Sequence, residues 1–491
     1  MKKVLFKVLL PVLLCLTITA CSTKAENNAT EKSVAETVSH VEQVQDSTTE
    51  KKDTESSYVE PTQAPTEAED NTNEESVADV KSLVEQAQAL IEAEDYEAAI
   101  PLLKQAAEQG SPEAQNILGN CYGEGLGVEQ SDEEAIKYYL LAAEQGYVGS
   151  RYNLGLTYLY GFGVEQDVEK AIGYLKPLVD EGDAETQCLL GDVYSDGEVV
   201  EQDYKKASDY YQLAADQGMA EAQFNLANIY SFGQGVEQND KKALEYYSLA
   251  ADQGYAPALS NLGYCYDNGL GVEIDYKKAA EYYQLAADLG HAVAQYNLGN
   301  DYFWGQGVEQ NAEKAVENYS LAANQGYAPA LAGLGYCYGN GIGVETDSDK
   351  MVEYYQLAID QDNVIAEYNL GWCYEIGFGV EQDAEKALKY YQMAADQGYA
   401  DAIFNIGLMY YEGNGVEKDY DKAIEYCSRA AELGHTTAIF LLGVCYQDGT
   451  GVEQDLEKAA EIYRQALEAG YEPDEGDQIR LEEVLGEEYI Q

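Results

Sequence analysis

The stretch NLGYCYDNGLGVEIDYKKAAEYYQLAADLG, residues 261–290, holds a Gly-Leu-Gly turn followed by a segment with a helical pattern. A glycine pair in front of a helix is compatible with a phosphate-binding loop or with the joint of a structural repeat. The first glycine of this turn belongs to a set of ten, which we call the marker glycines. They recur every 36 residues, at Gly125, Gly161, Gly197, Gly233, Gly269, Gly305, Gly341, Gly377, Gly413 and Gly449. A nucleotide fold uses its glycine loop once per site, so ten copies at one spacing predict a repeat array.

The residues before each marker glycine predict a first helix with one buried stripe. A small residue, usually Ala, lies eleven positions before the marker, Leu (Ile406 in one repeat) lies seven before, and Tyr lies three before. Spacings of four place these residues on one helix face. A glycine such as Gly263, replaced once by Ala227, follows the Leu. Because glycine costs about 1 kcal/mol of helix propensity, we expect another helix backbone to pass close to it.

The residues after each turn predict a second helix with an N-cap. The cap position holds a side chain that accepts hydrogen bonds from free N–H groups, namely Ser131, Asp167, Asp203, Asn239, Asp275, Asn311, Asp347, Asp383, Asp419 and Asp455. In the quoted repeat the helix then presents Ala279, Tyr283, Ala286 and Ala287 at helical spacing and ends at Gly290. Small residues facing tyrosines predict a closely packed helical hairpin.

The shared pattern A-x-x-x-L-G-x-x-Y-x-x-G-x-G-V-x-x-D-x-x-K-A-x-x-Y-Y-x-x-A-A-x-x-G resembles the Sel1-like repeat, a relative of the tetratricopeptide repeat. The resemblance covers ten repeats over residues 111–470. It implies an all-α fold, a right-handed α-solenoid of stacked helical hairpins, that acts as an adaptor with partner proteins on its concave surface. Two repeats depart from the pattern, because Val199 replaces the second glycine of one turn and Asp362 replaces one terminal glycine.

Both flanks of the ten repeats carry helical patterns. Residues 77–110 resemble a shorter, tetratricopeptide-like unit, in which Asp95, Ala99 and Leu103 fall in phase with the later caps and second helices. Residues 471–491, with Ile479, Val484 and Leu485, are expected to form a C-terminal capping helix.

The N-terminus resembles a bacterial lipoprotein signal. Lys2, Lys3 and Lys7 accompany an apolar stretch that ends in Ile18-Thr19-Ala20-Cys21. By this resemblance residues 1–20 are removed, Cys21 carries diacylglycerol, and the protein is a membrane-anchored lipoprotein on the extracytoplasmic side of the cell envelope. An ordinary secretory signal is the alternative. Residues 21–76 are rich in Ser, Thr, Glu and Asn, which predicts a disordered acidic linker after the lipidated cysteine.

Charge narrows the class of partner. The chain has 89 acidic and 29 basic residues, a formal charge of -60, which becomes -63 once the three lysines of residues 1–20 are removed. Nucleic acid is not expected as a ligand, because its recognition requires basic residues that neutralise phosphates. We therefore expect protein or peptide partners, in particular basic ones. The alternative is that the acidic residues only keep a long array soluble.

The supply of catalytic residues argues against an enzyme. The chain has three histidines, of which His40 lies in the linker while His291 and His435 occupy turn positions that hold Tyr in other repeats. No metal-binding spacing, nucleophile elbow or phosphate loop is present in the sequence, and we expect no cofactor. Five cysteines, Cys121, Cys265, Cys337, Cys373 and Cys445, share the position four before the marker. They are expected to pack as small apolar residues.

Positions twelve, nine, five and two before each marker share one side of the first helix, which we call the first-helix face. Their occupants vary from repeat to repeat, and aromatic residues collect there in repeats 292–412. We predict partner binding by Tyr296, Asn300, Phe303, Tyr336, Tyr368, Trp372, Phe404 and Tyr411, with Trp304 one position off the face. Aromatic residues dominate binding hot spots. Two alternatives stay open: the aromatic residues only pack between repeats, or the array is a non-binding structural spacer in the envelope.

Overall fold

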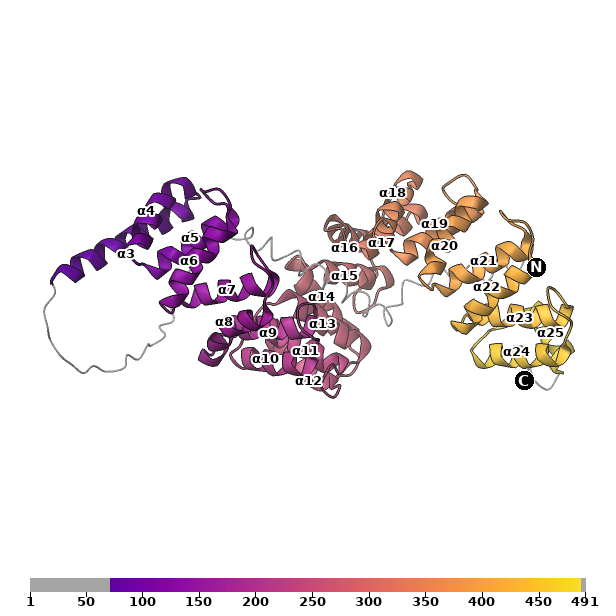
Figure 1. The fold of residues 1–491 in the computed structure, drawn as a ribbon. Coiled ribbons are helices and arrows are strands. Elements are labelled where there is room, and N and C mark those ends of the chain that lie inside the picture. The colour runs from indigo at the N-terminus through magenta and orange to yellow at the C-terminus, as the bar shows by residue number, and fades with distance from the viewer. Residues whose placement is uncertain (1–70, 487–491) are drawn as a thin grey trace. The chain divides into compact units, whose positions relative to one another are not determined.

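The computed structural model describes residues 71–486, and all regular elements in that range are α-helices (Figure 1). The chain divides into two compact parts, residues 71–249 and residues 250–486 of the described range, and each is considered by itself. The helices of the first part are α3 (Asn71–Glu92), α4 (Tyr96–Glu108), α5 (Pro112–Glu124), α6 (Asp132–Glu144), α7 (Val148–Tyr160), α8 (Val168–Glu181), α9 (Ala184–Asp196), α10 (Tyr204–Asp216), α11 (Ala220–Phe232) and α12 (Asp240–Ala251), which reaches the boundary. Those of the second part are α13 (Ala256–Asn268), α14 (Tyr276–Asp288), α15 (Ala292–Trp304), α16 (Ala312–Asn324), α17 (Ala328–Asn340), α18 (Ser348–Ile359), α19 (Val364–Ile376), α20 (Ala384–Asp396), α21 (Ala400–Glu412), α22 (Tyr420–Glu432), α23 (Thr436–Asp448), α24 (Leu456–Glu468) and α25 (Glu475–Leu485).

Consecutive helices pair as hairpins, and the hairpins stack. In the second part α13 packs on α14, α15 on α16 and α17 on α18, while α14 also contacts α15 and α16 contacts α17. The same alternation holds in the first part from α3 to α10. The predicted all-α solenoid of stacked helical hairpins is therefore confirmed.

The Gly-x-Gly turn is the joint between hairpins. Each marker glycine ends a first helix in the left-handed region, with φ between +66° and +77°. The second glycine also has positive φ, and in eight repeats it lies against the first residue of the preceding second helix, as Gly307 lies against Tyr276. A Cβ on Gly307 would overlap the carbonyl group of Tyr276. Glycine is therefore required both by the backbone conformation and by the close approach of the neighbouring repeat.

All ten predicted N-caps are confirmed. In each, the side chain accepts the backbone N–H three residues on, as Asp275 accepts that of Lys278 at 3.1 Å. The backbone N–H of each cap residue donates to the carbonyl of the Tyr three before the marker, at 2.7–3.0 Å. The side-chain bond starts the second helix, and the backbone bond closes the loop onto the first.

The predicted buried stripe is right for the small residue and, except at Leu442, for the Leu, but wrong for the Tyr. The small residues are all fully buried, whereas the Tyr is half-buried in every repeat except at Tyr158. In eight repeats its ring stacks on a second-helix Tyr, as Tyr266 does on Tyr282, with centroids 5.5–5.9 Å apart. In nine repeats a lysine Nζ, such as that of Lys278, lies 3.8–5.0 Å from the ring centroid. These rings therefore lie at the edge of the hairpin, where the charged partner stays hydrated.

We expected the backbone of another helix next to Gly263 and its equivalents. The nearest atoms instead belong to a side chain, in seven repeats that of a tyrosine. A Cβ built on Gly263 lies 2.6 Å from the ring of Tyr283, and one on Gly335 lies 2.7 Å from the ring of Tyr355. Backbone carbonyl oxygens come second, at 3.3 Å from the Cβ positions of Gly299, Gly371 and Gly407. The glycine makes room for a buried tyrosine ring inside the hairpin.

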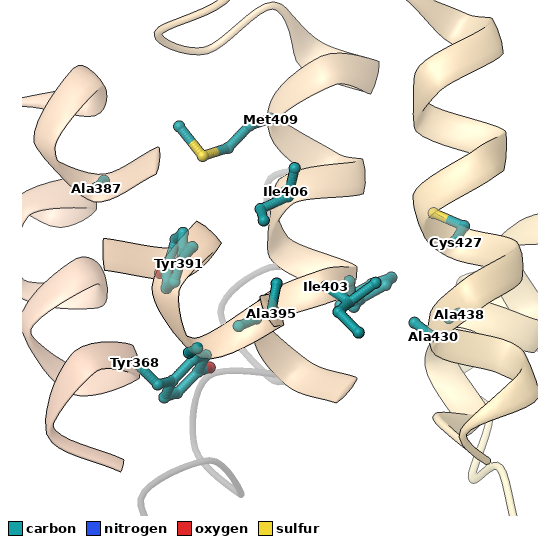
Figure 2. Packing of buried hydrophobic residues seen from close by; sticks show 13 residues of the cluster. Tyr368, Ala387, Tyr391, Ala395, Ile403, Ile406, Met409, Cys427, Ala430 and Ala438 are labelled. Carbon is teal, nitrogen blue, oxygen red and sulfur yellow. The ribbon is translucent and has the colours of Figure 1, made fainter. Parts of the chain in front are cut away.

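Each junction between hairpins adds its own apolar cluster. Figure 2 shows one, with Tyr368 of α19, Tyr391 of α20 and Ile406 of α21. The seven cysteines of the described residues are all buried and free, including Cys337 and Cys373, so their predicted core role is confirmed. Within residues 71–486 no helix combines the length and apolar character needed to cross a membrane. The predicted signal, Cys21 and the linker up to residue 70 lie outside the described residues. Residues 71–76, which the sequence analysis assigned to the linker, belong to α3.

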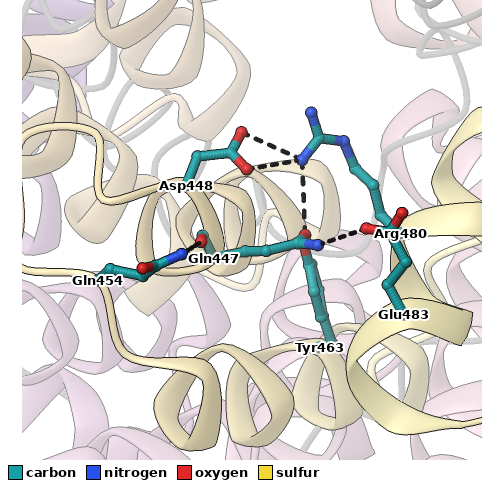
Figure 3. Close-up of polar contacts among 6 residues, drawn as sticks. All are labelled: Gln447, Asp448, Gln454, Tyr463, Arg480 and Glu483. Carbon is teal, nitrogen blue, oxygen red and sulfur yellow. Dashed lines mark hydrogen bonds and ion pairs between the residues drawn. The ribbon is translucent and has the colours of Figure 1, made fainter.

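The C-terminal helix α25 packs on the last hairpin through polar and apolar contacts. Arg480 lies 3.1 Å from Asp448, and the amide of Gln447 donates to Glu483 while its oxygen accepts the hydroxyl of Tyr463 (Figure 3). Leu481 is buried in this contact, and Val484 and Leu485 pack beside it. Ile479, which we expected to pack here, is 58% exposed, because Leu481 rather than Ile479 faces the hairpin.

The tyrosine–glycine contact generates a stability prediction. Gly335→Ala should destabilise the protein by about 1–2 kcal/mol, because overpacking the Tyr355 ring outweighs the gain in helix propensity. Gly173→Ala, inside α8, is the matched control. A Cβ there meets nothing within 4 Å, so this variant should be stabilised by about 0.5–1 kcal/mol. Urea unfolding followed by circular dichroism measures both. Equal stabilisation by the two substitutions would mean that the Tyr355 ring moves aside. The ring of Tyr247 must do the same beside Ala227.

Candidate partner-binding groove

Four of the predicted binding residues are buried. Tyr296, Phe303, Tyr368 and Phe404 are 9%, 8%, 3% and 4% exposed. They pack against neighbouring helices and turns within the second part of the chain. The ring of Tyr368, for example, lies 5.6 Å from that of Tyr391 and 5.1 Å from that of Tyr399. Position nine before the marker, which holds Tyr296, Tyr368 and Phe404, therefore supplies packing inside the array, as one of the two sequence-based alternatives held.

The other five predicted residues are half-buried. Asn300 accepts the hydroxyl of Tyr319 at 2.7 Å. The Trp372 ring lies 5.5 Å from that of Phe378, the Tyr411 ring 5.4 Å from that of Tyr420, and the Tyr336 ring 6.1 Å from that of Phe303. Trp304 packs edge-on against Phe303 at 4.7 Å. These side chains keep accessible surface, and their role in binding stays a prediction.

Position five before the marker has a structural role that the sequence pattern did not reveal. In four repeats its side chain accepts a hydrogen bond, of 2.6–2.9 Å, from the buried second-helix tyrosine of the same hairpin. The acceptors are Asn120, Asp192, Asn228 and Asn300. In the sequence, this hydrogen bond is indicated by an Asn or Asp nineteen residues before the tyrosine. Tyr264, Tyr336 and Trp372 replace this acceptor with an aromatic ring in three other repeats.

Asparagines join neighbouring repeats along the same face. The amide of Asn153 donates to Asn116 at 3.2 Å and to Asn120 at 3.0 Å, and that of Asn225 donates to Asp192 at 3.2 Å. Much of the polar surface beneath the first-helix face is thus used inside the array. What remains available to a partner is the half-buried aromatic surface.

Carboxyl groups with raised pKa values occur where repeats depart from the common pattern. Burial raises the pKa of Glu367 to about 7, and burial together with the charge of Asp267 raises that of Asp301 to about 8. Desolvation raises the pKa of Asp192 to about 7. The sequence signal was a carboxylate at a position where other repeats hold uncharged residues, which a comparison among repeats would have found.

The histidines are helix caps. The backbone N–H groups of Ala294 and Ala438 donate to Nδ1 of His291 and His435. His435 Nε2 also lies 3.1 Å from Asp401. Both rings are partly buried. Among the described residues no group of His, Cys, Asp and Glu side chains is arranged to hold a metal ion.

Comparison with known proteins gives one family and two informative structures. The model of the Sel1 repeat matches residues 89–111, 112–147, 149–183, 184–219, 220–255, 256–291, 292–327, 328–363, 364–399, 400–435 and 436–471. A protective antigen of uropathogenic Escherichia coli strains, displaying an SLR fold, is 34% identical with a TM-score of 0.63, over 78% of this chain and 82% of that one. A Sel1 repeat protein from Oxalobacter formigenes is 32% identical with a TM-score of 0.53, over 64% of this chain and 98% of that one. No curated protein matches the chain.

The buried Glu367 generates a prediction about pH. Four other repeats hold Gln at this position, and its amide donates to a carbonyl of the preceding second helix, as Gln295 does to Ala287. In three of these repeats the Gln oxygen also accepts from the Gln that ends the second helix of the same hairpin. Glu367 accepts from Gln397 at 2.9 Å but can donate only when protonated. Its pKa is about 7 in the fold against 4.5 ordinarily. The stabilisation is therefore fully present below pH 4.5 and is lost as the pH rises through 7.

Glu367→Gln should remove this loss. We expect the variant to match the parent at pH 4.5 and to exceed its stability by about 1–3 kcal/mol at pH 8, measured by urea unfolding across that range. Gln295→Glu, the reverse change in another repeat, should introduce the same dependence on pH. Parallel stability curves for parent and Glu367→Gln would contradict the assignment.

Proposed function

The chain belongs to the Sel1 repeat family, and from this premise we propose that it is an adaptor that holds a protein or peptide partner on the first-helix face. A stacked array of this kind offers an extended surface to which each repeat contributes one helix. The scaffold residues repeat while the surface residues vary, which allows one architecture to carry a specific site.

One observation carries the proposal. At position five before the marker, Tyr336 and Trp372 in successive repeats stand where Asn300 accepts a tyrosine hydroxyl. Two neighbouring repeats thus lack the polar acceptor and present large rings that stay half-buried. Half-buried aromatic residues next to one another are typical of binding hot spots.

The charge of the chain supports a basic partner. The formal charge is -60, and in nine repeats the lysine that follows the cap lies over a tyrosine ring of its own hairpin. An acidic surface attracts basic proteins over long distances and disfavours nucleic acid.

We also propose that the adaptor is tethered to a membrane on the extracytoplasmic side of a bacterial envelope. The support is the lipoprotein-like sequence ending at Cys21 and the acidic stretch between Cys21 and α3. Lipid on Cys21 would anchor the chain, and a flexible linker would let the array reach partners away from the membrane.

A capture experiment tests the binding surface. Residues 21–491 with Cys21→Ser, which keeps the chain free of lipid, serve as bait for envelope proteins after cross-linking. Tyr336→Ala with Trp372→Ala should reduce capture of a saturable partner about tenfold, because truncating a hot spot costs at least about 1.4 kcal/mol. Leu321→Ala with Leu357→Ala is the matched control. These leucines of α16 and α18 are 46% and 44% exposed and lie on second helices, so capture should not change.

Circular dichroism must first show that both double variants are folded. Loss of capture by the leucine variant, or equal capture by all baits, would place the partner elsewhere. The absence of any saturable partner would favour the structural spacer instead. Membrane tethering is tested separately, since Cys21→Ser in the full chain should move the protein from the membrane fraction to the soluble fraction.

A further inference from the structure

Glu375 accepts a hydrogen bond that position five before the marker accepts in four other repeats. Trp372 stands at position five in this repeat, so the acceptor comes from three residues further along α19. Oε2 of Glu375 accepts the hydroxyl of Tyr391 at 2.6 Å. In the last repeat an uncharged side chain does the same, because Gln447 accepts the hydroxyl of Tyr463 at 2.6 Å. The hydrogen bond therefore does not require the negative charge of Glu375.

The second carboxylate oxygen of Glu375 is accessible and unused. Tyr391, which is 0% exposed, fixes the carboxylate through Oε2, and Oε1 makes no hydrogen bond within residues 79–486. The fully buried side-chain oxygen and nitrogen atoms without a partner in this range are Oδ2 of Asp301 and Nε1 of Trp304. Oε1 is not among them, so it contacts solvent, in agreement with the half-buried state of the side chain. Burial and the charge of Glu412 raise the pKa of this carboxyl group, and a cation bound to it would offset that cost.

Trp372 lies beside Glu375 on α19. The two residues are three apart, which makes their side chains neighbours on the helix surface. Trp372 is half-buried, and its ring centroid lies 5.5 Å from that of Phe378, so part of the indole is held by the turn that follows α19 while another part stays accessible. Tryptophan is the aromatic side chain that attracts cations most strongly. An accessible indole and an accessible carboxylate oxygen are thus placed side by side.

The charge of Glu375 is not compensated by the array. In residues 328–435 the four positions of the first-helix face hold two charged residues, Glu375 and Asp401, and no lysine or arginine. Asp401 has a partner, because its Oδ1 atom lies 3.1 Å from Nε2 of His435. No lysine or arginine in the part of the chain that the structure describes forms an ion pair with Glu375. This face therefore presents one carboxylate without a cation, next to its largest ring.

We propose that Trp372 and Glu375 form a subsite for one arginine side chain of a basic partner segment. The guanidinium group stacks on the accessible part of the indole, and one of its N–H groups donates to Oε1 of Glu375. Arginine fits better than lysine, because its cation is planar, stacks on aromatic rings and is less strongly hydrated. The inference rests on the proposed adaptor function and names the side chain that its first-helix face selects.

The indole N–H group of Trp372 reports on this subsite. The chain has two tryptophans, so the ¹⁵N-labelled protein (residues 21–491, Cys21→Ser) gives two indole resonances, and Trp372→Phe assigns them. Trp304 is an internal reference, because its Nε1 atom is fully buried. The probe is the peptide acetyl-Gly-Arg-Gly-amide, and the control is the same peptide with citrulline, the neutral isostere, in place of arginine. We expect a saturable shift of the Trp372 resonance with the arginine peptide alone.

Two substitutions make the test specific. Glu375→Gln keeps an acceptor for Tyr391 and should weaken binding of the arginine peptide about tenfold, because a charge-assisted hydrogen bond is lost. Glu353→Gln removes an equal charge from the exposed side of α18 and should leave the affinity unchanged. Circular dichroism checks that both variants are folded. If Glu375→Gln is not, Glu375→Ser replaces it, since two other repeats hold serine at this position.

The proposal is overturned if the Trp372 resonance does not shift, if the citrulline peptide shifts it equally, or if Glu375→Gln binds as well as the parent. Glu375 is then only the acceptor for Tyr391. Such a failure is distinguishable from failure of the adaptor function. A partner captured equally by the parent and by Glu375→Gln, yet lost with Tyr336→Ala and Trp372→Ala, leaves the adaptor intact.

Discussion

The contact between a second-helix tyrosine and a first-helix glycine organises most of the hairpins. In seven repeats the ring occupies the space that a glycine Cβ would fill. Because the glycine has no side chain, the two helices can enclose a ring that is almost completely buried, as Tyr319 and Tyr391 are. The hydroxyl of the same tyrosine reaches position five before the marker in four repeats. One side chain thus connects the core of the hairpin to the surface proposed to bind a partner.

The local structure could be predicted because it depends on residues close in sequence. The N-caps, the glycine turns and the Ala–Leu stripe each follow from conformational preferences or helical spacing within one repeat. The burial of the first-helix aromatics could not be predicted in this way. Tyr368 can face either a binding partner or Tyr399, depending on how the next hairpin stacks. The residue pattern of a single helix carries no information about that stacking. The tyrosines three before the marker, such as Tyr266, were wrongly predicted to be buried. They are held by stacking on a second tyrosine and by contact with a lysine, neither of which requires burial.

The polar interior is informative where the repeats disagree. Asp301 and Glu367 stand at positions where other repeats hold uncharged residues, and burial raises the pKa of both. Each substitution introduces a charge that the repeated architecture has no group to neutralise. Glu367 accepts a hydrogen bond from Gln397, whereas Oδ2 of Asp301 is buried without a hydrogen-bond partner among the described residues. Comparing repeats of one chain therefore separates residues that maintain the array from residues that give one part of it a distinct chemistry.

The backbone hydrogen bond from each cap residue to the tyrosine three before the marker closes the loop within a single repeat. In eight repeats the second glycine meets the equivalent residue of the preceding repeat. The hairpins therefore present equivalent surfaces to the hairpins that precede and follow them. Genetic duplication or loss of a whole 36-residue segment would join surfaces that already fit. The number of repeats is in this sense free to change during evolution, while any insertion of another length would misalign caps, turns and tyrosines together.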